Sequence, residues 1–469
     1  MFTYIQELID KSQGSISISD FMNAVLYHER YGYYTSRLPL GKDGDFTTAP
    51  EISQLFGEVI AVWIMHTWEK LGKPSKFSLV ELGPGKGTLI HDIIRVTKKY
   101  SSFFNSMLIH LVEISLTLRK IQKEKLKGLD VNWHKDIDNL PEQPTIFLAN
   151  EFFDALPIDQ FVYRDGQWYE NRVTKQDDGV SFQCVALKSR KKESWVPVLA
   201  TQTTNGKLFN GAVVEICSTG VEILKKLEKK IHNNKGAALI IDYGYVYPAY
   251  KSTLQSIKQH KYANFLENVG NSDITALVNF QALRDSLKHV DCEILTQREF
   301  LYLFGIKERT QALMKSASDE QKNRIFSEFL RLTENMGTLF KAMLLIALLK
   351  RSKQRNYFIV NELFKKQSES NKEVIREYWG DDEKASDVNK IYVEFLEEVK
   401  QEVKKRLDEE FPGIPNDIKG IIENLKYAEL PSSNLTNTSI DYDQKKEMRK
   451  KYQIEVKDAF EMGVLNNTQ

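Results

Sequence analysis

Apolar runs of strand length recur between residues 77 and 241. They occupy residues 77–82, 107–112, 129–133, 145–149 and 237–241. Runs this short and this apolar are typical of strands buried on both faces of a sheet. A helix is expected directly after the first run, and another over residues 220–232, before the last run. This alternation predicts an α/β fold whose sheet is built from βαβ units.

The segments around this pattern have a different character. The N-terminal segment is predicted to be a helical cap followed by a glycine-rich, aromatic loop. Strand-like runs on both sides of Asp165-Gly166 predict a hairpin within a β-rich insertion at about 158–218. Residues 389–411 combine Glu and Lys with apolar residues at helical spacing, which predicts an amphipathic helix in a C-terminal extension of unknown role. We therefore divide the chain into residues 1–76, 77–345 and 346–469.

The composition excludes several classes of protein. With 42% hydrophobic residues, the chain of 469 residues can bury a large core. Its 65 Lys and Arg almost balance its 64 Asp and Glu, so no general attraction to nucleic acid or to an anionic membrane is expected. No apolar run reaches the roughly 18 residues of a membrane-spanning helix, so we expect no membrane insertion.

The cysteines and the N-terminus predict a compartment. Cys184, Cys217 and Cys292 lie far apart without a C-x-x-C pair, which argues against a zinc site and against a disulfide framework. No metal is therefore expected, and a reducing compartment fits. Glu7 and Asp10 make the N-terminus unlike a signal peptide or an acid-poor transit peptide. We expect a cytoplasmic protein.

A glycine-rich turn follows the first strand. Glu81 lies near the end of that strand, and Gly83, Gly85 and Gly87 come next at alternate positions. Glycines permit backbone angles closed to other residues and let a ligand lie against the main chain. A dinucleotide site would place its third glycine at Thr88, so that interpretation fits poorly. The spacing resembles motif I of class I methyltransferases, whose glycines pass the methionine part of S-adenosylmethionine; the alternative is a tight turn without a ligand.

A carboxylate ends the second strand. Glu113 directly follows residues 107–112. An ionised carboxylate at this place can accept hydrogen bonds from both ribose hydroxyls of a nucleotide or nucleoside. The alternative is a surface glutamate that caps the strand. Together with the glycine-rich turn, Glu113 favours a nucleoside-containing ligand.

Six motifs carry a more specific resemblance, and in chain order they read FMNAVLYHERYGYY, GDFTTAPEISQLFGE, LVELGPGKGTL, NEFFDALPIDQF, IIDYGY and DITALVNF. They span about residues 5–345 and resemble the MidA family of methyltransferases, which includes a mitochondrial assembly factor that modifies an arginine of a respiratory complex I subunit. The resemblance implies a Rossmann-like class I methyltransferase core with S-adenosylmethionine as cofactor. It also implies a protein substrate, with a complex I subunit as one candidate.

The resemblance implies further donor-site residues. A segment equivalent to residues 44–58 folds over the donor site in this family, which assigns Thr48, Pro50 and Glu51 to it. An acid at the end of the third strand commonly meets the adenine amino group, and Asp136 is the candidate. The alternative for Asp136 is a solvated turn residue, since Asp is common in turns.

The fourth strand delivers the candidate catalytic groups. Ligands of open α/β sheets lie beyond the carboxyl ends of the strands, so Asn150, Glu151 and Asp154 are expected at the reacting methyl. A guanidinium has a pKa of about 12.5 or higher, so an arginine acceptor needs carboxylates to hold it and receive its proton. Glu151 and Asp154 are assigned that role, and Asn150 is assigned to the donor site, where it could also orient an amine. Helix capping is the alternative for the two acids. Asp242, after the fifth strand, is either catalytic or a cap.

Two departures from the family pattern leave the activity open. Leu277 and Asn279 stand where the pattern has His and Asp, which removes two ionisable groups. We expect a protein arginine methyltransferase, with two alternatives: a methyltransferase of small molecules, or a non-catalytic assembly factor that binds S-adenosylmethionine. The sequence leaves the acceptor and the oligomeric state, including a homodimer, undetermined.

Overall fold

The computed structural model describes residues 1–36, 48–176, 179–186, 209–246, 250–258 and 261–347. All of them belong to the first of the chain's two units, residues 1–381; the second unit is residues 382–469. The predicted C-terminal extension, apart from its first two residues, lies outside the described residues, as does its predicted helix over residues 389–411.

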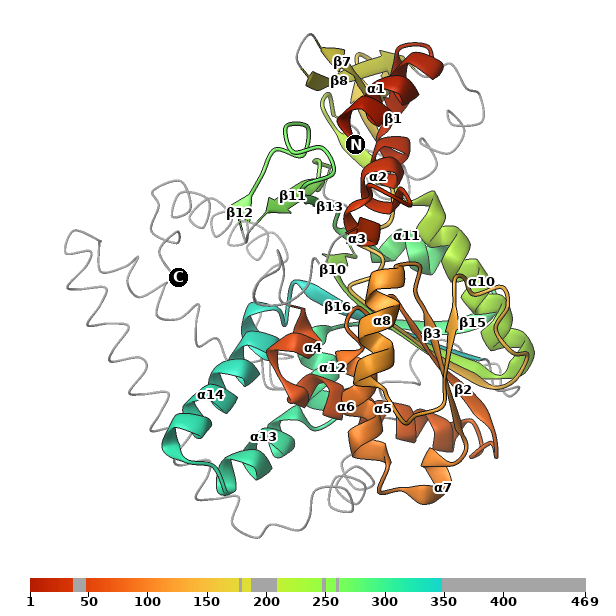
Figure 1. Cartoon of the computed structure of the whole chain (residues 1–469), viewed down its shortest axis with the longest axis vertical. Coiled ribbons are helices and arrows are strands. Elements are labelled where there is room, and N and C mark those ends of the chain that lie inside the picture. Colours follow the sequence, from red (N-terminus) through yellow and green to blue (C-terminus); the bar gives the residue numbers. More distant parts are fainter. Residues whose placement is uncertain (37–47, 177–178, 187–208, 247–249, 259–260, 348–469) are drawn as a thin grey trace, which may run out of the picture. The chain divides into compact units, whose positions relative to one another are not determined.

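Eight strands form the main sheet of the described chain (Figure 1). Seven of them follow the order β15 (Val290–Thr296), β16 (Phe340–Ala347), β10 (Gly236–Tyr245), β5 (Thr145–Asn150), β2 (Phe77–Leu82), β3 (Met107–Val112) and β4 (Val131–His134), and the short β14 (Val278–Asn279) pairs with β10. The neighbouring strands β10, β5, β2, β3 and β4 are parallel, whereas β16 is antiparallel to both its neighbours. The predicted α/β fold is confirmed, and the predicted strands match β2 and β3 residue for residue.

The chain reverses direction across the sheet between β2 and β5. Strand β3 follows β2 on one side, and β5 returns on the other. Connections leaving a parallel sheet in opposite directions leave a crevice at the carboxyl ends of the two strands, where ligands bind in this class of fold. The glycine-rich turn after β2 lies at this switch point.

Both faces of the sheet are covered, which explains why its strands are continuous apolar runs. Leu79 and Val80, neighbours on β2, are both fully buried but belong to different cores. The Leu79 side packs against α5 (Gln54–Lys70), α6 (Thr88–Thr97), α7 (Ser101–Phe104), α12 (Gln297–Leu303), α13 (Ile306–Lys315), α14 (Asp319–Leu330) and the π-helix η1 (Arg331–Asn335). The Val80 side packs against α10 (Ser218–Asn234) and α11 (Phe280–Asp285).

The N-terminal segment shares a sheet with the insertion. Strand β1 (Ser15–Ser17) pairs with β7 (Gln167–Gln176). The second sheet that they share also holds β6 (Asp159–Arg164), β8 (Gly179–Ala186) and β9 (Val213–Ile216). Arg164 pairs with Gln167, so the predicted hairpin on Asp165-Gly166 is confirmed. The apolar pattern did not indicate β1, because a strand of three residues carries too little periodicity.

A third core joins this region to a small three-stranded sheet. It gathers residues of α1 (Phe2–Lys11), α2 (Ile18–Tyr27), α3 (Tyr33–Ser36) and β13 (Asp273–Thr275), and β13 pairs with β11 (Gln255–Lys258), which pairs with β12 (Lys261–Tyr262). Residues 49–52 form the short helix α4 (Ala49–Ile52), directly before α5. Across the described part of the chain, every helix is too short or too polar to cross a membrane.

Candidate active site

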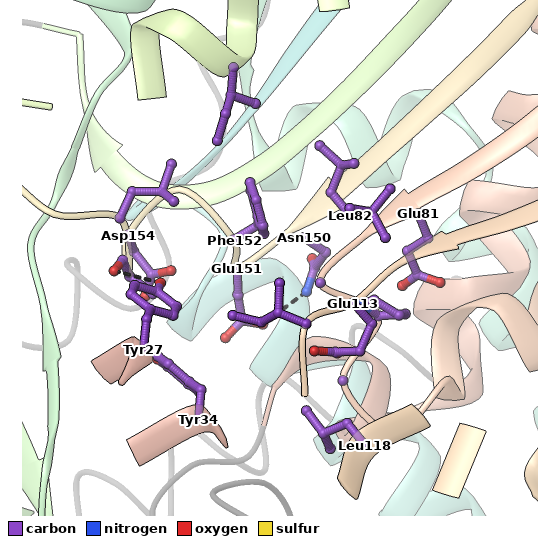
Figure 2. Close-up of a pocket in the computed structure, with 18 of the residues that line it drawn as sticks. Tyr27, Tyr34, Glu81, Leu82, Glu113, Leu118, Asn150, Glu151, Phe152 and Asp154 are labelled. Atoms are coloured by element: carbon purple, nitrogen blue, oxygen red, sulfur yellow. Dashed lines mark hydrogen bonds between the residues drawn. The ribbon is translucent and has the colours of Figure 1, made fainter. Parts of the chain in front are cut away.

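A cavity of about 680 Å³ lies at the switch point, beyond the carboxyl ends of β2, β3, β4 and β5 (Figure 2). It brings together residues predicted from four separate strands and from the segment before α5. The predicted residues that line it are Thr48, Pro50, Glu51, Glu81, Gly83, Gly85, Glu113, Asp136, Asn150, Glu151 and Asp154. Gly87 is not among the lining residues; it is the N-cap of α6.

Each of the three glycines in the glycine-rich turn has a backbone conformation that favours glycine. Gly83, Gly85 and Gly87 have φ angles of 59°, 52° and 76°, in the left-handed region. A Cβ at Gly83 would lie 2.8 Å from the ring of Phe152. At Gly83 and Gly85, which line the cavity, the turn has no side chain, so a ligand can lie against the backbone there.

Glu113 is buried, so it is not a surface cap. Its side chain is 6% exposed; Oε1 accepts from the backbone N–H of Ser115 (2.7 Å) and Oε2 from Nε2 of Gln122 (3.2 Å). Burial raises its pKa, and these hydrogen bonds oppose the rise. The carboxylate is thus held in one orientation at the cavity wall.

Gln122, on α8 (Leu116–Lys125), is a site residue that sequence reasoning missed. It is fully buried, and its Nε2 also donates to the carbonyl oxygen of Gly85 (2.7 Å). Its Oε1 accepts from the indole N–H of Trp133 (2.9 Å). One amide thus links the glycine-rich turn, the carboxylate after β3 and strand β4. The sequence gives no signal for it, because Gln122 sits in a run of polar residues.

Three buried acceptor atoms on the cavity wall have no hydrogen-bond partner in the described structure. They are Oε2 of Glu81, Oδ1 of Asn150 and Oδ1 of Asp154. Burial raises the pKa of Glu81 to about 8. Buried polar atoms are nearly always hydrogen-bonded, so these oxygens are expected to accept hydrogen bonds from a bound ligand. The expected S-adenosylmethionine brings an ammonium group, ribose hydroxyls and an adenine amino group, and the glycines at positions 83 and 85 leave room for it beside the main chain.

Two carboxyl groups follow β5. Glu151 has a φ of 48°, unusual for a side-chained residue, and its Oε1 accepts from the N–H of Ala49 (3.0 Å) and from Nδ2 of Asn150 (3.2 Å). Burial, reinforced by the neighbouring charge of Asp154, raises the pKa of Glu151 to about 7. Burial also raises the pKa of Asp154 to about 6, against a hydrogen bond from Tyr243. Both groups can therefore take up a proton near neutral pH.

Asp242 acts as a cap for the backbone that carries these groups. Its Oδ2 accepts from the N–H groups of Phe152 (3.1 Å), Phe153 (2.9 Å) and Asp154 (3.2 Å). It is fully buried and does not line the cavity. Of the two interpretations of Asp242, the structure supports the cap: it fixes the path of the chain just after Glu151.

The remaining predicted donor residues lie toward the rim. Asp136 is exposed, and its Oδ1 accepts from the N–H of Asp138 (2.9 Å), so it is a turn residue that also lines the cavity. Glu51 accepts from the hydroxyl of Thr88 and lies 3.8 Å from Nζ of Lys86, which ties α4 to the helix after the glycine-rich turn. Residues 44–47 of the segment expected to fold over the donor lie outside the described residues.

The two departures from the family pattern are not part of the cavity wall. Neither Leu277 nor Asn279 lines it. Asn279 is the N-cap of α11, where its Oδ1 accepts from the N–H of Ala282 (3.0 Å), and the N–H of Leu277 donates to Oγ1 of Thr253 (3.0 Å). Their replacement therefore leaves the described groups of the site in place.

Comparison with known proteins gives consistent matches. A family model described as "Putative S-adenosyl-L-methionine-dependent methyltransferase" matches residues 59–296. "Protein arginine methyltransferase NDUFAF7, mitochondrial" of Danio rerio is 36% identical over 355 residues, covering 70% of this chain and 82% of its own. The Homo sapiens protein of the same name is 32% identical over 340 residues, covering 66% and 74%.

A solved structure shares the fold. The crystal structure of a COG1565 superfamily member from Burkholderia thailandensis, bound to S-adenosyl-homocysteine, matches with a TM-score of 0.64 at 23% identity. The match covers 75% of this chain and 92% of that chain. It supports the Rossmann-like methyltransferase core expected from the sequence.

The predicted cytoplasmic location is wrong. The relatives from Danio rerio, Xenopus tropicalis and Homo sapiens are all named as mitochondrial proteins. Widely spaced cysteines indicate a reducing compartment but do not say which one, and an acidic N-terminus did not decide the matter.

Proposed function

This chain belongs to the family of S-adenosylmethionine-dependent methyltransferases that its sequence matches, and we propose that it methylates an arginine side chain of a protein. The names of its relatives support an arginine of a protein as the acceptor. The observation that carries the proposal is the pair Glu151 and Asp154, two carboxyl groups with pKa values raised to about 7 and about 6 at one end of the cavity.

We assign the donor end of the cavity to the residues around the glycine-rich turn. Glu113 accepts from the ribose hydroxyls, and Asp136 meets the adenine amino group. Glu81 and Asn150 offer their unpartnered oxygens to the ammonium group. The turn of Gly83, Gly85 and Gly87 passes the methionine part, and the segment with Thr48, Pro50 and Glu51 covers it.

We call the part of the cavity lined by Glu151 and Asp154 the acceptor end, and we assign proton transfer to it. S-adenosylmethionine, when bound, supplies a methyl group on a sulfonium sulfur, which keeps the bonding electron pair as the methyl leaves. A guanidinium stays charged at neutral pH because its pKa is about 12.5 or higher, and it is a poor nucleophile while charged. Glu151, with a pKa of about 7, is suited to accept the guanidinium proton near neutral pH. Asp154 stabilises the positive charge of the acceptor before transfer.

Calorimetric titration of S-adenosylmethionine tests the donor site. Wild type should bind, whereas Gly85→Val and Glu113→Ala should not, since one fills the turn and the other removes the ribose acceptor. Glu124→Ala, an exposed change on α8, is the matched control and should bind like wild type. A well-folded wild type that gives no heat would overturn the methyltransferase assignment.

Transfer is tested with a tritiated methyl group. The enzyme is incubated with mitochondrial extract and S-adenosylmethionine that carries the tritiated methyl group. We expect the label to appear as methylarginine after acid hydrolysis of the protein fraction. Glu151→Gln should bind the donor but transfer little label. Label in free metabolites alone would favour the small-molecule alternative. Donor binding without any transfer would favour the non-catalytic assembly factor.

The finer partner assignment rests on the resemblance to the MidA family. We propose a subunit of respiratory complex I as the acceptor and a role in assembly of that complex. Affinity purification of complex I from the labelled extract should then enrich methylarginine, and its absence from that fraction would contradict this acceptor. Analytical ultracentrifugation of the purified chain would show whether it forms a homodimer.

A further inference from the structure

Two motifs of the family resemblance have no role in donor binding or proton transfer. One contains Tyr34, on α3 near the N-terminus, and the other contains Asp273, on β13. The structure joins them, because the hydroxyl of Tyr34 donates to Oδ1 of Asp273 (2.7 Å) across a separation of 239 residues. Both residues line the cavity. Both motifs therefore meet at the cavity wall, where they can contact a bound molecule.

Tyr27 extends the same wall. Its ring lies nearly parallel to that of Tyr34, with 5.7 Å between ring centroids and 27° between ring planes. Its hydroxyl donates to the carbonyl oxygen of Ala155 (2.9 Å), next to Asp154. Figure 2 shows Tyr27 beside Asp154, with Tyr34 following it, on the side of Glu151 away from Glu113. Tyr27 and Tyr34, which we call the aromatic wall, therefore belong to the acceptor end.

The acceptor end also carries buried carboxyl groups. Asp154 and Asp273 are 6% and 4% exposed, and Oδ1 of Asp154 has no hydrogen-bond partner in the described structure. Burial raises the pKa of Tyr27 and of Tyr34 well above 10, so both phenols stay neutral hydrogen-bond donors. Aromatic rings next to carboxylates provide a setting for a cation rather than for a neutral or anionic group.

We infer that Tyr27, Tyr34, Asp154 and Asp273 form an arginine box, a subsite that accepts a guanidinium and discriminates against the ammonium of lysine. A guanidinium is planar, stacks on aromatic faces and offers several N–H donors in a fixed fork that matches carboxylates. An ammonium is a compact, strongly hydrated point charge and gains little from such a wall. This inference rests on the proposed function and adds the residues that select the acceptor.

Adenosine conjugates test the box without knowledge of the acceptor protein. Their 5′ substituent is an alkyl chain that ends in a guanidinium, a primary ammonium or a neutral urea, and calorimetry measures their affinity. We expect wild type to bind the guanidinium conjugate about tenfold or more tightly than the other two, since bidentate pairing and stacking favour it. Asp273→Asn and Tyr27→Leu should each reduce that preference to about threefold or less, and Tyr34→Phe, which keeps the ring, should reduce it partly.

Two controls keep the result interpretable. S-adenosylhomocysteine should bind all variants like wild type, which shows that they are folded and that the donor end is intact. Tyr31→Phe changes an exposed tyrosine four residues after Tyr27 and should leave the preference for guanidinium unchanged.

Equal binding of the guanidinium and ammonium conjugates by wild type would overturn the box. So would an undiminished preference in both Asp273→Asn and Tyr27→Leu. Failure of the box can be told from failure of the proposed function. If wild type shows no preference for the guanidinium conjugate but still forms methylarginine in protein, only the box is contradicted. If wild type shows the preference but labels only free metabolites, only the protein acceptor is contradicted.

Discussion

The side-chain amide of Gln122 donates to the carbonyl oxygen of Gly85 over 2.7 Å and to Oε2 of Glu113 over 3.2 Å. A single buried side chain thereby sets the distance between the turn assigned to the methionine part and the carboxylate assigned to the ribose. The sheet brings these two elements side by side, but the amide fixes their spacing.

Replacement of Gln122 should therefore weaken donor binding. Gln122→Ala leaves buried acceptors and the Trp133 donor unpaired, a loss of about 1–3 kcal/mol for each unsatisfied group. We expect the affinity for S-adenosylmethionine to fall by about tenfold or more, measured by calorimetry. Glu124→Ala, on the exposed side of the same helix, should leave the affinity unchanged. Wild-type affinity in Gln122→Ala would show that the donor site holds its shape without the amide.

Asp242 should matter for stability. Asp242→Ala removes the acceptor of three consecutive N–H groups in the buried turn after β5. The free energy of unfolding should fall by about 3 kcal/mol or more, because three N–H groups lose their acceptor and each buried unsatisfied group costs about 1–3 kcal/mol. Thermal unfolding measures this, with the exposed Asp285→Ala as control. Equal melting temperatures for the two variants would contradict the capping role.

Donor binding should release protons near pH 7. The pKa of Glu81 is raised to about 8, so this carboxyl is mostly protonated at pH 7 in the free protein. A cationic ligand nearby favours the carboxylate and lowers that pKa, so a proton leaves on binding. Calorimetry in phosphate and in Tris should give different heats, since the two buffers take up protons with different enthalpies. Glu81→Gln should reduce the difference, and identical heats for wild type would contradict this assignment.

The methyl transfer rate should rise with pH through about 7. The pKa of Glu151 is raised from 4.5 to about 7, so the carboxyl is protonated below that pH and cannot accept a proton. Above it the base is ionised, and the rate should level off. Glu151→Gln should lower the rate by about a hundredfold or more and abolish this rise. A wild-type rate independent of pH from 6 to 8 would exclude Glu151 as the base.

Restoring the family residues at the two departures should change little. Neither Leu277 nor Asn279 lines the cavity, so the double variant Leu277→His, Asn279→Asp should keep the wild-type transfer rate within about twofold. Asp at position 279 can still cap α11 and adds a favourable charge at a helix N-terminus, which is worth about 0.3–1 kcal/mol. A large gain in rate would instead mean that the natural chain is impaired at these positions.

The sequence by itself determined the five parallel strands of the sheet and most of the predicted residues that line the cavity at their carboxyl ends. Strands β2 and β3 were predicted at their observed bounds, because a strand covered on both faces must be apolar along its whole length. The glycines and Glu113 were found for a similar local reason: a sharp turn and a strand end each impose a requirement on one short stretch of chain.

Only the tertiary structure decided which distant residues contact one another around the cavity. Tyr34 meets Asp273 across 239 residues, and Asp242 caps a turn some 90 residues before it. Gln122 donates to Gly85 from a helix whose polar sequence is typical of solvent-exposed helices. A hydrogen bond between distant residues leaves no periodic pattern in either segment, since each end needs only one polar side chain at one position. Such pairs exist only once the strands and helices that carry them have been packed.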